Sequence, residues 1–172
     1  MLAPNMLIRE RYLIVQALEG TAYQAIDTPN RSSVVLKQVP LSDHAPDTLA
    51  YLERQAKALM ALRHPALPAV VDYFVNGDHV CLVSEFVLGE RQVPRGQPAP
   101  LPAEHVLALA SQALGALAAL HGQGLLHRGV KPQNLILAAD GQLRLVDCGL
   151  APLRPQAPAA RVGAGLGSSL QF

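Results

Sequence analysis

The sequence His127-Arg128-Gly129-Val130-Lys131-Pro132-Gln133-Asn134 decides how this chain folds. A long Ala/Leu-rich segment with helical character, 103–121, precedes it, and a short apolar segment, 135–137, follows it. The loop carries a cation, Lys131, and an amide, Asn134, on either side of a proline that restricts the backbone. The stretch therefore predicts a polar loop between a helix and a strand.

The pattern of strands and helices around this loop is regular. Short β-branched or alternating segments predict strands at 11–17, 22–27, 33–39, 70–75, 80–86, 135–137 and 143–146. Asn76-Gly77-Asp78 predicts a hairpin turn. Apolar residues at helical spacing predict an amphipathic helix over 49–62, and the helix over 103–121 is apolar on nearly every side, which predicts deep burial. The Pro/Gly-rich connector 89–102 looks like a hinge.

Composition excludes several classes of protein. The 172 residues fit one domain, half are hydrophobic, 16% are charged, and the formal net charge is +1. No basic cluster predicts nucleic-acid binding or attraction to an anionic membrane. Residues 1–10 show no secretory signal, and the most apolar stretch, 106–120, is too short to span a bilayer. Cys81 and Cys148 lack zinc-site spacing, so we expect a soluble, cytoplasmic protein with two reduced thiols.

Two motifs together carry a family resemblance. Residues 127–134 are similar to the catalytic loop of Ser/Thr protein kinases, and Asp147-Cys148-Gly149, thirteen residues beyond Asn134, resembles the kinase Asp-Phe-Gly motif. An ordinary helix-to-strand turn is the alternative interpretation, but six matching positions and the flanking segments favour the family. The resemblance implies ATP and Mg²⁺ as cofactors, with Lys131 at the γ-phosphate. It also implies that Asn134 and Asp147 are the magnesium ligands.

Lys37 ends a third motif, Val34-Val35-Leu36-Lys37, which resembles the kinase Val-Ala-Ile-Lys sequence. The resemblance implies that Lys37 contacts the α- and β-phosphates and is held by a glutamate on the following helix. Counted from His64-Pro65, that helix position is Gln55, whose amide cannot form an ion pair. Outside this context Lys37 would be an ordinary surface lysine.

The segment between the first two strands matches the family poorly. Kinases place three glycines there to close over the phosphates, whereas 18–23 contains only Gly20, so a plain hairpin turn is the better interpretation. Residues 82–89 resemble the kinase hinge, with Ser84 at the gatekeeper position. The resemblance implies that the backbone of two hinge residues bonds adenine and that three apolar side chains enclose the purine: Glu85 and Val87, then Ala22, Val35 and Ile136.

Gly129 stands where the kinase catalytic loop carries its aspartate. Glycine has no side chain to accept or orient a proton, and a positioned base typically contributes about 10²–10⁴-fold to the rate. Cys148 replaces the usual aromatic residue, and we interpret it as a small buried hydrophobe rather than a redox switch. No Thr or Tyr follows Asp147, so Arg128 lacks the usual phosphorylated partner. These changes predict impaired catalysis.

The expected fold class is α+β, a bilobal protein-kinase-like fold. One domain spans 1–172, with a β-rich N-lobe at 7–88, a partial helical C-lobe at 89–150 and a flexible tail at 151–172. The chain stops before the later C-lobe helices of the family. This implies that an apolar face of the 103–121 helix is open to a protein partner.

Three functions remain open at this point. The first is a pseudokinase that keeps a residual ATP and Mg²⁺ pocket and acts by binding. The second is an active but weak ATP-dependent Ser/Thr kinase that relies on Lys131 and on proton loss assisted by the substrate. The third is a degraded gene product without a stable function. ATP binding separates the first from the third, and phosphoryl transfer separates the first from the second.

Overall fold

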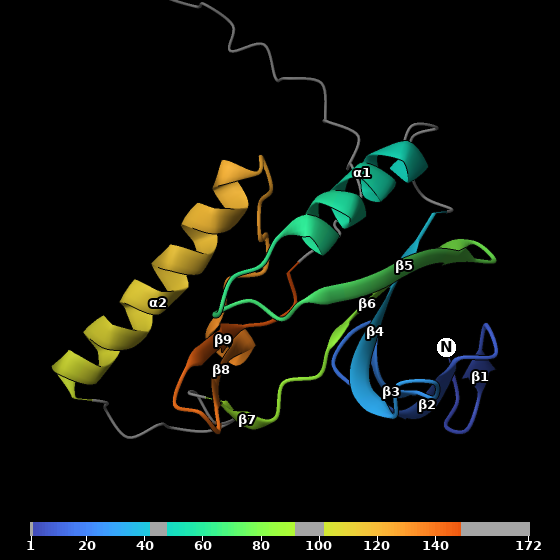
Figure 1. Ribbon diagram of the computed structural model, residues 1–172, viewed down its shortest axis with the longest axis horizontal. Coiled ribbons are helices and arrows are strands. Elements are labelled where there is room, and N and C mark those ends of the chain that lie inside the picture. Colours follow the sequence, from blue (N-terminus) through green and yellow to red (C-terminus); the bar gives the residue numbers. More distant parts are fainter. Residues whose placement is uncertain (1, 42–47, 92–101, 149–172) are drawn as a thin grey trace, which may run out of the picture.

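A computed structural model describes residues 2–41, 48–91 and 102–148 of the chain (Figure 1). Its larger part is a six-stranded antiparallel sheet in the order β1-β2-β3-β4-β6-β5. The strands are β1 (Leu7–Ile8), β2 (Tyr12–Ala17), β3 (Ala22–Asp27), β4 (Ser32–Pro40), β5 (Val70–Asn76) and β6 (His79–Glu85). The five predicted strands of this region are confirmed to within one residue at each end, and β1 was not predicted.

The two faces of this sheet have different neighbours. Along β4, Val34 and Leu36 are fully buried on one face, where they belong to a core built from strand side chains alone. Val35 and Lys37 alternate onto the other face and are only half-buried. That second face is covered at one end, near Val39, by a helix. The remaining part of the second face carries Lys37, which meets Asp147 from the second part of the chain, and we call the region between these two parts the cleft.

The covering helix is α1 (Thr48–Ala61), which packs across β5 and β6 (Figure 1). Leu52, Ala56 and Leu59 recur at spacings of four and three, so their side chains share one stripe, and this stripe is buried. Leu120 and Leu125, from the second part of the chain, belong to the same buried cluster. The cluster therefore joins the two parts of the molecule behind the cleft. The predicted amphipathic helix is confirmed.

The second part contains a three-stranded antiparallel sheet in the order β7-β8-β9. Its elements are β7 (Gly89–Arg91), α2 (Ala103–Gly122), a 3-10 turn η1 (Pro132–Asn134), β8 (Leu135–Ala138) and β9 (Leu143–Leu145). The sequence interpretation placed β7 in a hinge and missed its pairing with β8. A Cβ atom at Gly89 would lie 2.3 Å from the carbonyl oxygen of Leu137, so the close approach of these strands requires glycine. The connector 92–101 and the tail 149–172 lie outside the described residues.

Helix α2 does not show the deep burial predicted from its composition. Only Leu109, Ala116 and Leu120 are buried, while Leu107 and Leu114 are 70% and 65% exposed. The inner stripe packs against β9, whereas no described residue covers the outer face. The prediction failed because a helix that is apolar on every side is buried only where other elements pack against it.

The length of α2 also corrects the sequence interpretation. At 20 residues it is, among the described helices, the one long and apolar enough to cross a membrane, so shortness does not exclude a span. One such helix is weak evidence, because core helices of domains pass the same test. The buried stripe against β9 identifies α2 as part of the folded domain.

A buried charge network closes the sheet at the end of β3. The Asp27 side chain is only 3% exposed, and Arg11 donates two hydrogen bonds of 2.8 Å to its two carboxylate oxygens. Asn30 donates a third hydrogen bond of 2.7 Å. Hydrogen bonding from Arg11 holds the pKa of Asp27 below its ordinary value. The Tyr12 hydroxyl, at the start of β2, donates to Asp72 on the edge strand β5 at 2.7 Å.

Candidate functional site

The loop 127–134 is held by bonds to its own backbone. The buried His127 accepts a hydrogen bond at Nδ1 from the Gly129 N–H, at 3.2 Å. The Asn134 Nδ2 donates to the Gly129 carbonyl at 2.7 Å, and the Asn134 carbonyl accepts from the Val146 N–H at 2.9 Å. Asn134 is buried, so its amide is fixed with the nitrogen turned inward and the oxygen left to bind elsewhere. Burial lowers the pKa of His127, which keeps the ring neutral.

Lys37 and Asp147 meet across the cleft. The Lys37 Nζ lies 2.5 Å from Asp147 Oδ1, and the two side chains are 23% and 39% exposed. They are 110 residues apart in sequence, so only the tertiary fold brings them together. Asp147 has φ 62° and Arg128 has φ 58°, a left-handed backbone that costs energy in residues other than glycine. The structure therefore places both predicted nucleotide-side charges in one cleft.

Gly129 leaves an open position beside these groups. A Cβ atom built there would lie 3.4 Å from Asn134 Nδ2, 3.5 Å from the Asp147 carbonyl oxygen and 3.7 Å from His127 Nδ1. These are ordinary contact distances, and the residue has no positive φ. The backbone could therefore carry an aspartate, so the missing carboxylate is a change of residue rather than of loop geometry.

Gln55 bonds within its own helix instead of reaching Lys37. Its Nε2 donates to the Tyr51 hydroxyl at 2.5 Å, and Arg128 Nη2 donates to the same oxygen at 2.8 Å. Tyr51 therefore links α1 directly to the loop 127–134. As expected from its neutral amide, Gln55 forms no ion pair with Lys37. Tyr51 was not predicted as a site residue, because the sequence indicated only that it lies one helical turn before Gln55.

Lys131 reaches the turn between β2 and β3. Its Nζ lies 3.1 Å from Glu19 Oε1, with side chains 42% and 46% exposed. The turn is tight, because the Leu18 N–H donates to the Ala22 carbonyl at 2.8 Å and Gly20 adopts φ +69°. Glu19 was not predicted as a site residue. Its acidic charge, in the turn where kinases place their glycine-rich loop, was the available signal.

The predicted purine-binding residues lie on the elements that border the cleft. Ala22 pairs with Lys37 and Val35 pairs with Ser84, so these four share the half-buried face of the sheet. Glu85 ends β6 and Val87 follows it, between the two parts of the molecule. Ile136 lies on β8, in the small sheet beyond the hinge. Their roles toward adenine stay a prediction.

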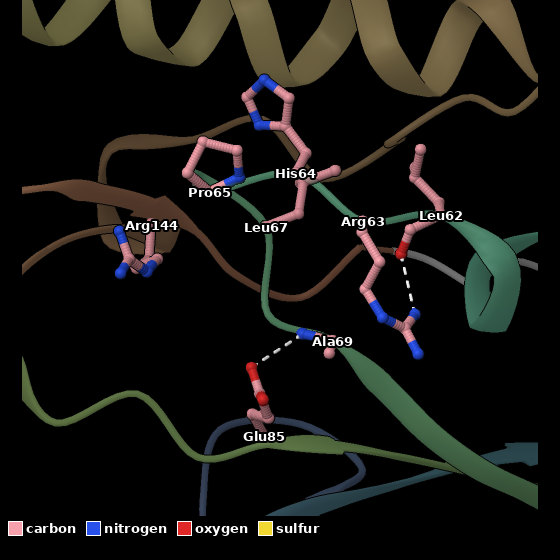
Figure 2. Close-up of a pocket in the computed structure, with 8 residues that line it drawn as sticks. All are labelled: Leu62, Arg63, His64, Pro65, Leu67, Ala69, Glu85 and Arg144. Atoms are coloured by element: carbon pink, nitrogen blue, oxygen red, sulfur yellow. Dashed lines mark hydrogen bonds between the residues drawn. The ribbon is translucent and has the colours of Figure 1, made fainter.

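A pocket lies beside the segment that joins α1 to β5 (Figure 2). It measures about 430 Å³ and is lined by Leu62, Arg63, His64, Pro65, Leu67, Ala69, Glu85 and Arg144. The Glu85 carboxylate points toward Ala69 and accepts its backbone N–H at 3.0 Å. Lys37, Asn134 and Asp147 take no part in the lining. This pocket is thus distinct from the cleft that holds the predicted charges.

Both cysteines are free thiols in the structure. Cys148 packs against the buried cluster that contains α1, which agrees with its interpretation as a small hydrophobe. Burial raises the pKa of Cys81 and of Cys148 to about 11 in each case. Both thiols therefore stay protonated and unreactive near neutral pH.

The chain is similar to known protein kinases. A family model described as protein kinase domain matches residues 17–164. Serine/threonine-protein kinase pkn2 of Myxococcus xanthus is 34% identical over 98% of this chain and 22% of its own length. Serine/threonine-protein kinase PknL of Mycobacterium tuberculosis is 34% identical over 96% of this chain and 43% of its own length. The chain thus spans less than half the length of either relative.

A solved structure resembles the fold closely. A double mutant of the Mycobacterium tuberculosis PknI kinase domain superposes with a TM-score of 0.76 at 26% identity. The match covers 92% of this chain and 68% of that one. The α+β, protein-kinase-like fold expected from the sequence is confirmed.

Proposed function

This chain belongs to the protein kinase domain family, and on that premise we propose that it is a Ser/Thr-kinase-like domain with a residual Mg²⁺-ATP site and impaired phosphoryl transfer. The observation that carries the proposal is Gly129. Gly129 lies among Asn134, Asp147 and His127, where a Cβ atom would fit at ordinary contact distances. The loop therefore supplies the groups that hold phosphate and metal and lacks the group that accepts the proton.

Binding rests on charges that the fold has already brought together. We assign Lys37, which meets Asp147, to the α- and β-phosphates, and the side-chain oxygens of Asn134 and Asp147 to Mg²⁺, because a hard cation prefers oxygen ligands. When bound, the metal ion would neutralise phosphate charge and orient the terminal phosphoryl group. Affinity should be weak, because Gln55 bonds to Tyr51 and leaves Lys37 without a carboxylate from α1.

The alternative is an active but weak ATP-dependent protein Ser/Thr kinase. It is favoured by Lys131, which occupies the loop position of the family's phosphate-contacting lysine. It is disfavoured by Gly129, because no described carboxylate stands within the loop to orient a substrate hydroxyl. Its positioning of a peptide is unsupported as well, and positioning supplies most of the catalysis in this chemistry.

Titration of Mg²⁺-ATP into the wild type and into Lys37→Met tests the proposed site. We expect weak binding by the wild type and a further loss of about tenfold in Lys37→Met, because a charge-assisted hydrogen bond contributes roughly 1.5 kcal/mol. Lys57→Met is the matched control, since Lys57 is exposed on α1 outside the cleft. Equal affinities in all three proteins would contradict a phosphate role for Lys37. No binding by the wild type would reject the pocket.

A role by binding alone also needs a surface for a partner. The exposed Leu107 and Leu114 on the outer face of α2 support a protein contact there. We also propose that the protein is cytoplasmic, with no nucleic-acid or membrane contact. Light scattering over a range of protein concentrations tests whether this face of α2 associates with a second copy of the chain. A strict monomer whose solubility is unchanged by Leu107→Glu would argue against an interaction face.

A further inference from the structure

We infer that Glu19 is a selectivity gate that withholds Lys131 from the terminal phosphate of a nucleotide. The inference rests on the proposed nucleotide site and adds to it a preference among nucleotides. Glu19 belongs to the β2–β3 turn and Lys131 to the loop 127–134, and their side chains meet at 3.1 Å. The pair joins the two sides of the cleft at the point where a terminal phosphate would contact Lys131.

The geometry of the turn makes Glu19 a fixed feature. The Leu18 N–H to Ala22 carbonyl bond closes the turn around it. Gly20 at φ +69° allows a tight reversal that other residues adopt at a cost. On the next strand, the Gln38 N–H donates to the Thr21 carbonyl at 2.9 Å, which anchors the far side of the turn. The short, anchored turn holds the Glu19 backbone at a place from which its carboxylate reaches Lys131.

The two ion pairs of the cleft respond differently to a nucleotide. Asp147 is a proposed magnesium ligand, so its charge has a use when Lys37 turns to the phosphates. Glu19 is not a proposed magnesium ligand, so its negative charge beside Lys131 repels an arriving phosphate. A phosphate must therefore displace Glu19 and tolerate its charge. The penalty falls on the terminal phosphate of ATP and spares ADP, so the wild type should bind both with similar affinity.

The test measures the dissociation constants of Mg²⁺-ATP and Mg²⁺-ADP for the wild type and for Glu19→Gln. The substitution keeps the side-chain size and removes the charge, and the backbone bond that closes the turn is unaffected. Glu104→Gln is the matched control, because Glu104 is exposed in the first turn of α2. We expect Glu19→Gln to tighten ATP about fivefold at low salt, as for a half-exposed ion pair. ADP affinity and the control should stay unchanged, and the ATP gain should shrink at high salt.

A second comparison tests the role of Lys131. In a Lys131→Gln background, Glu19→Gln should lose most of its effect on ATP, because the cation that it releases is gone. A full gain in that background would overturn the inference, and so would an equal gain for ATP and ADP or no gain for either. If the wild type binds ADP and Glu19→Gln changes nothing, the gate is rejected while the proposed pocket stands. If no variant binds either nucleotide, the pocket and the gate are both rejected.

Discussion

In the large sheet, the Asp27 side chain is 3% exposed and receives two hydrogen bonds from Arg11, whereas in the cleft the Asp147 side chain is 39% exposed and meets one lysine. The first pair joins the residue before β2 to the last residue of β3, two strands that are neighbours in sequence and in space. The second joins residues from opposite sides of the cleft. Buried, fully bonded charges cost much to break, while half-exposed charges exchange partners easily. The comparison separates charges that hold the fold from charges that are available to a ligand.

The same contrast appears in the neighbours of each region. The sheet face that carries Val34 and Leu36 is closed by its own strands. The face that carries Lys37 is covered by α1 at one end and left open toward the loop 127–134. In the cleft, Gln55 bonds to Tyr51 on its own helix, and Lys37 pairs with Asp147 from the second part of the chain.

Asp27→Ala should produce the largest loss of stability among these variants. A small loss would contradict the view that the buried Arg11–Asp27 pair holds the fold. Removing a buried carboxylate leaves Arg11 and Asn30 without their main acceptor, at a cost of about 2 kcal/mol once the partial exposure of Arg11 is taken into account. Urea unfolding measures the loss. Asp140→Ala is the control, because Asp140 pairs with Arg144 on the surface and should cost much less. Equal losses in the two variants would show that burial of the pair is not what matters.

The dependence of the free energy of unfolding on acid pH tests the role of Asp27 through a smaller effect. The pKa of Asp27 is lowered in the folded state by its bond to Arg11, so the folded chain releases the proton more readily than the unfolded chain. Stability from this group is therefore present above the ordinary carboxyl pKa and is lost as pH falls through that value toward the folded one. Unfolding at pH 6 and at decreasing pH below about 5 should show a shallower decline in Asp27→Asn than in the wild type. Parallel declines would mean that other carboxylates dominate.

Gly129→Asp should have the smallest effect, namely no gain in phosphoryl transfer. The residue fits the backbone, as the contact distances at Gly129 show, so the variant should fold. It restores a proton acceptor but not the helix carboxylate absent at Gln55. A radiolabel transfer assay on a generic basic protein substrate compares the variant with the wild type. Robust transfer by the wild type would overturn the impaired-kinase proposal, and transfer only by the variant would show that the missing base was the main defect.

Much of the fold could be read from the sequence because its signals are local. Alternation and turn residues placed five strands of the large sheet within one residue. The strands β1 and β7 were not predicted, because an alternating pattern over two or three residues cannot be distinguished from a turn. The outer face of α2 was misjudged, since its apolar composition says nothing about which neighbours are present.

The sequence by itself determined the family motifs and their defects. Lys37, Asn134 and Asp147 hold positions in register, and Gly129 lacks a side chain whatever the structure does. Only the tertiary structure decided which charges meet: Lys131 with Glu19 across 112 residues, and Arg128 with Tyr51 across 77. The physical reason is range. Motifs and periodicities report the local backbone, whereas an ion pair across a cleft depends on the packing of whole elements, which brings distant side chains within bonding distance.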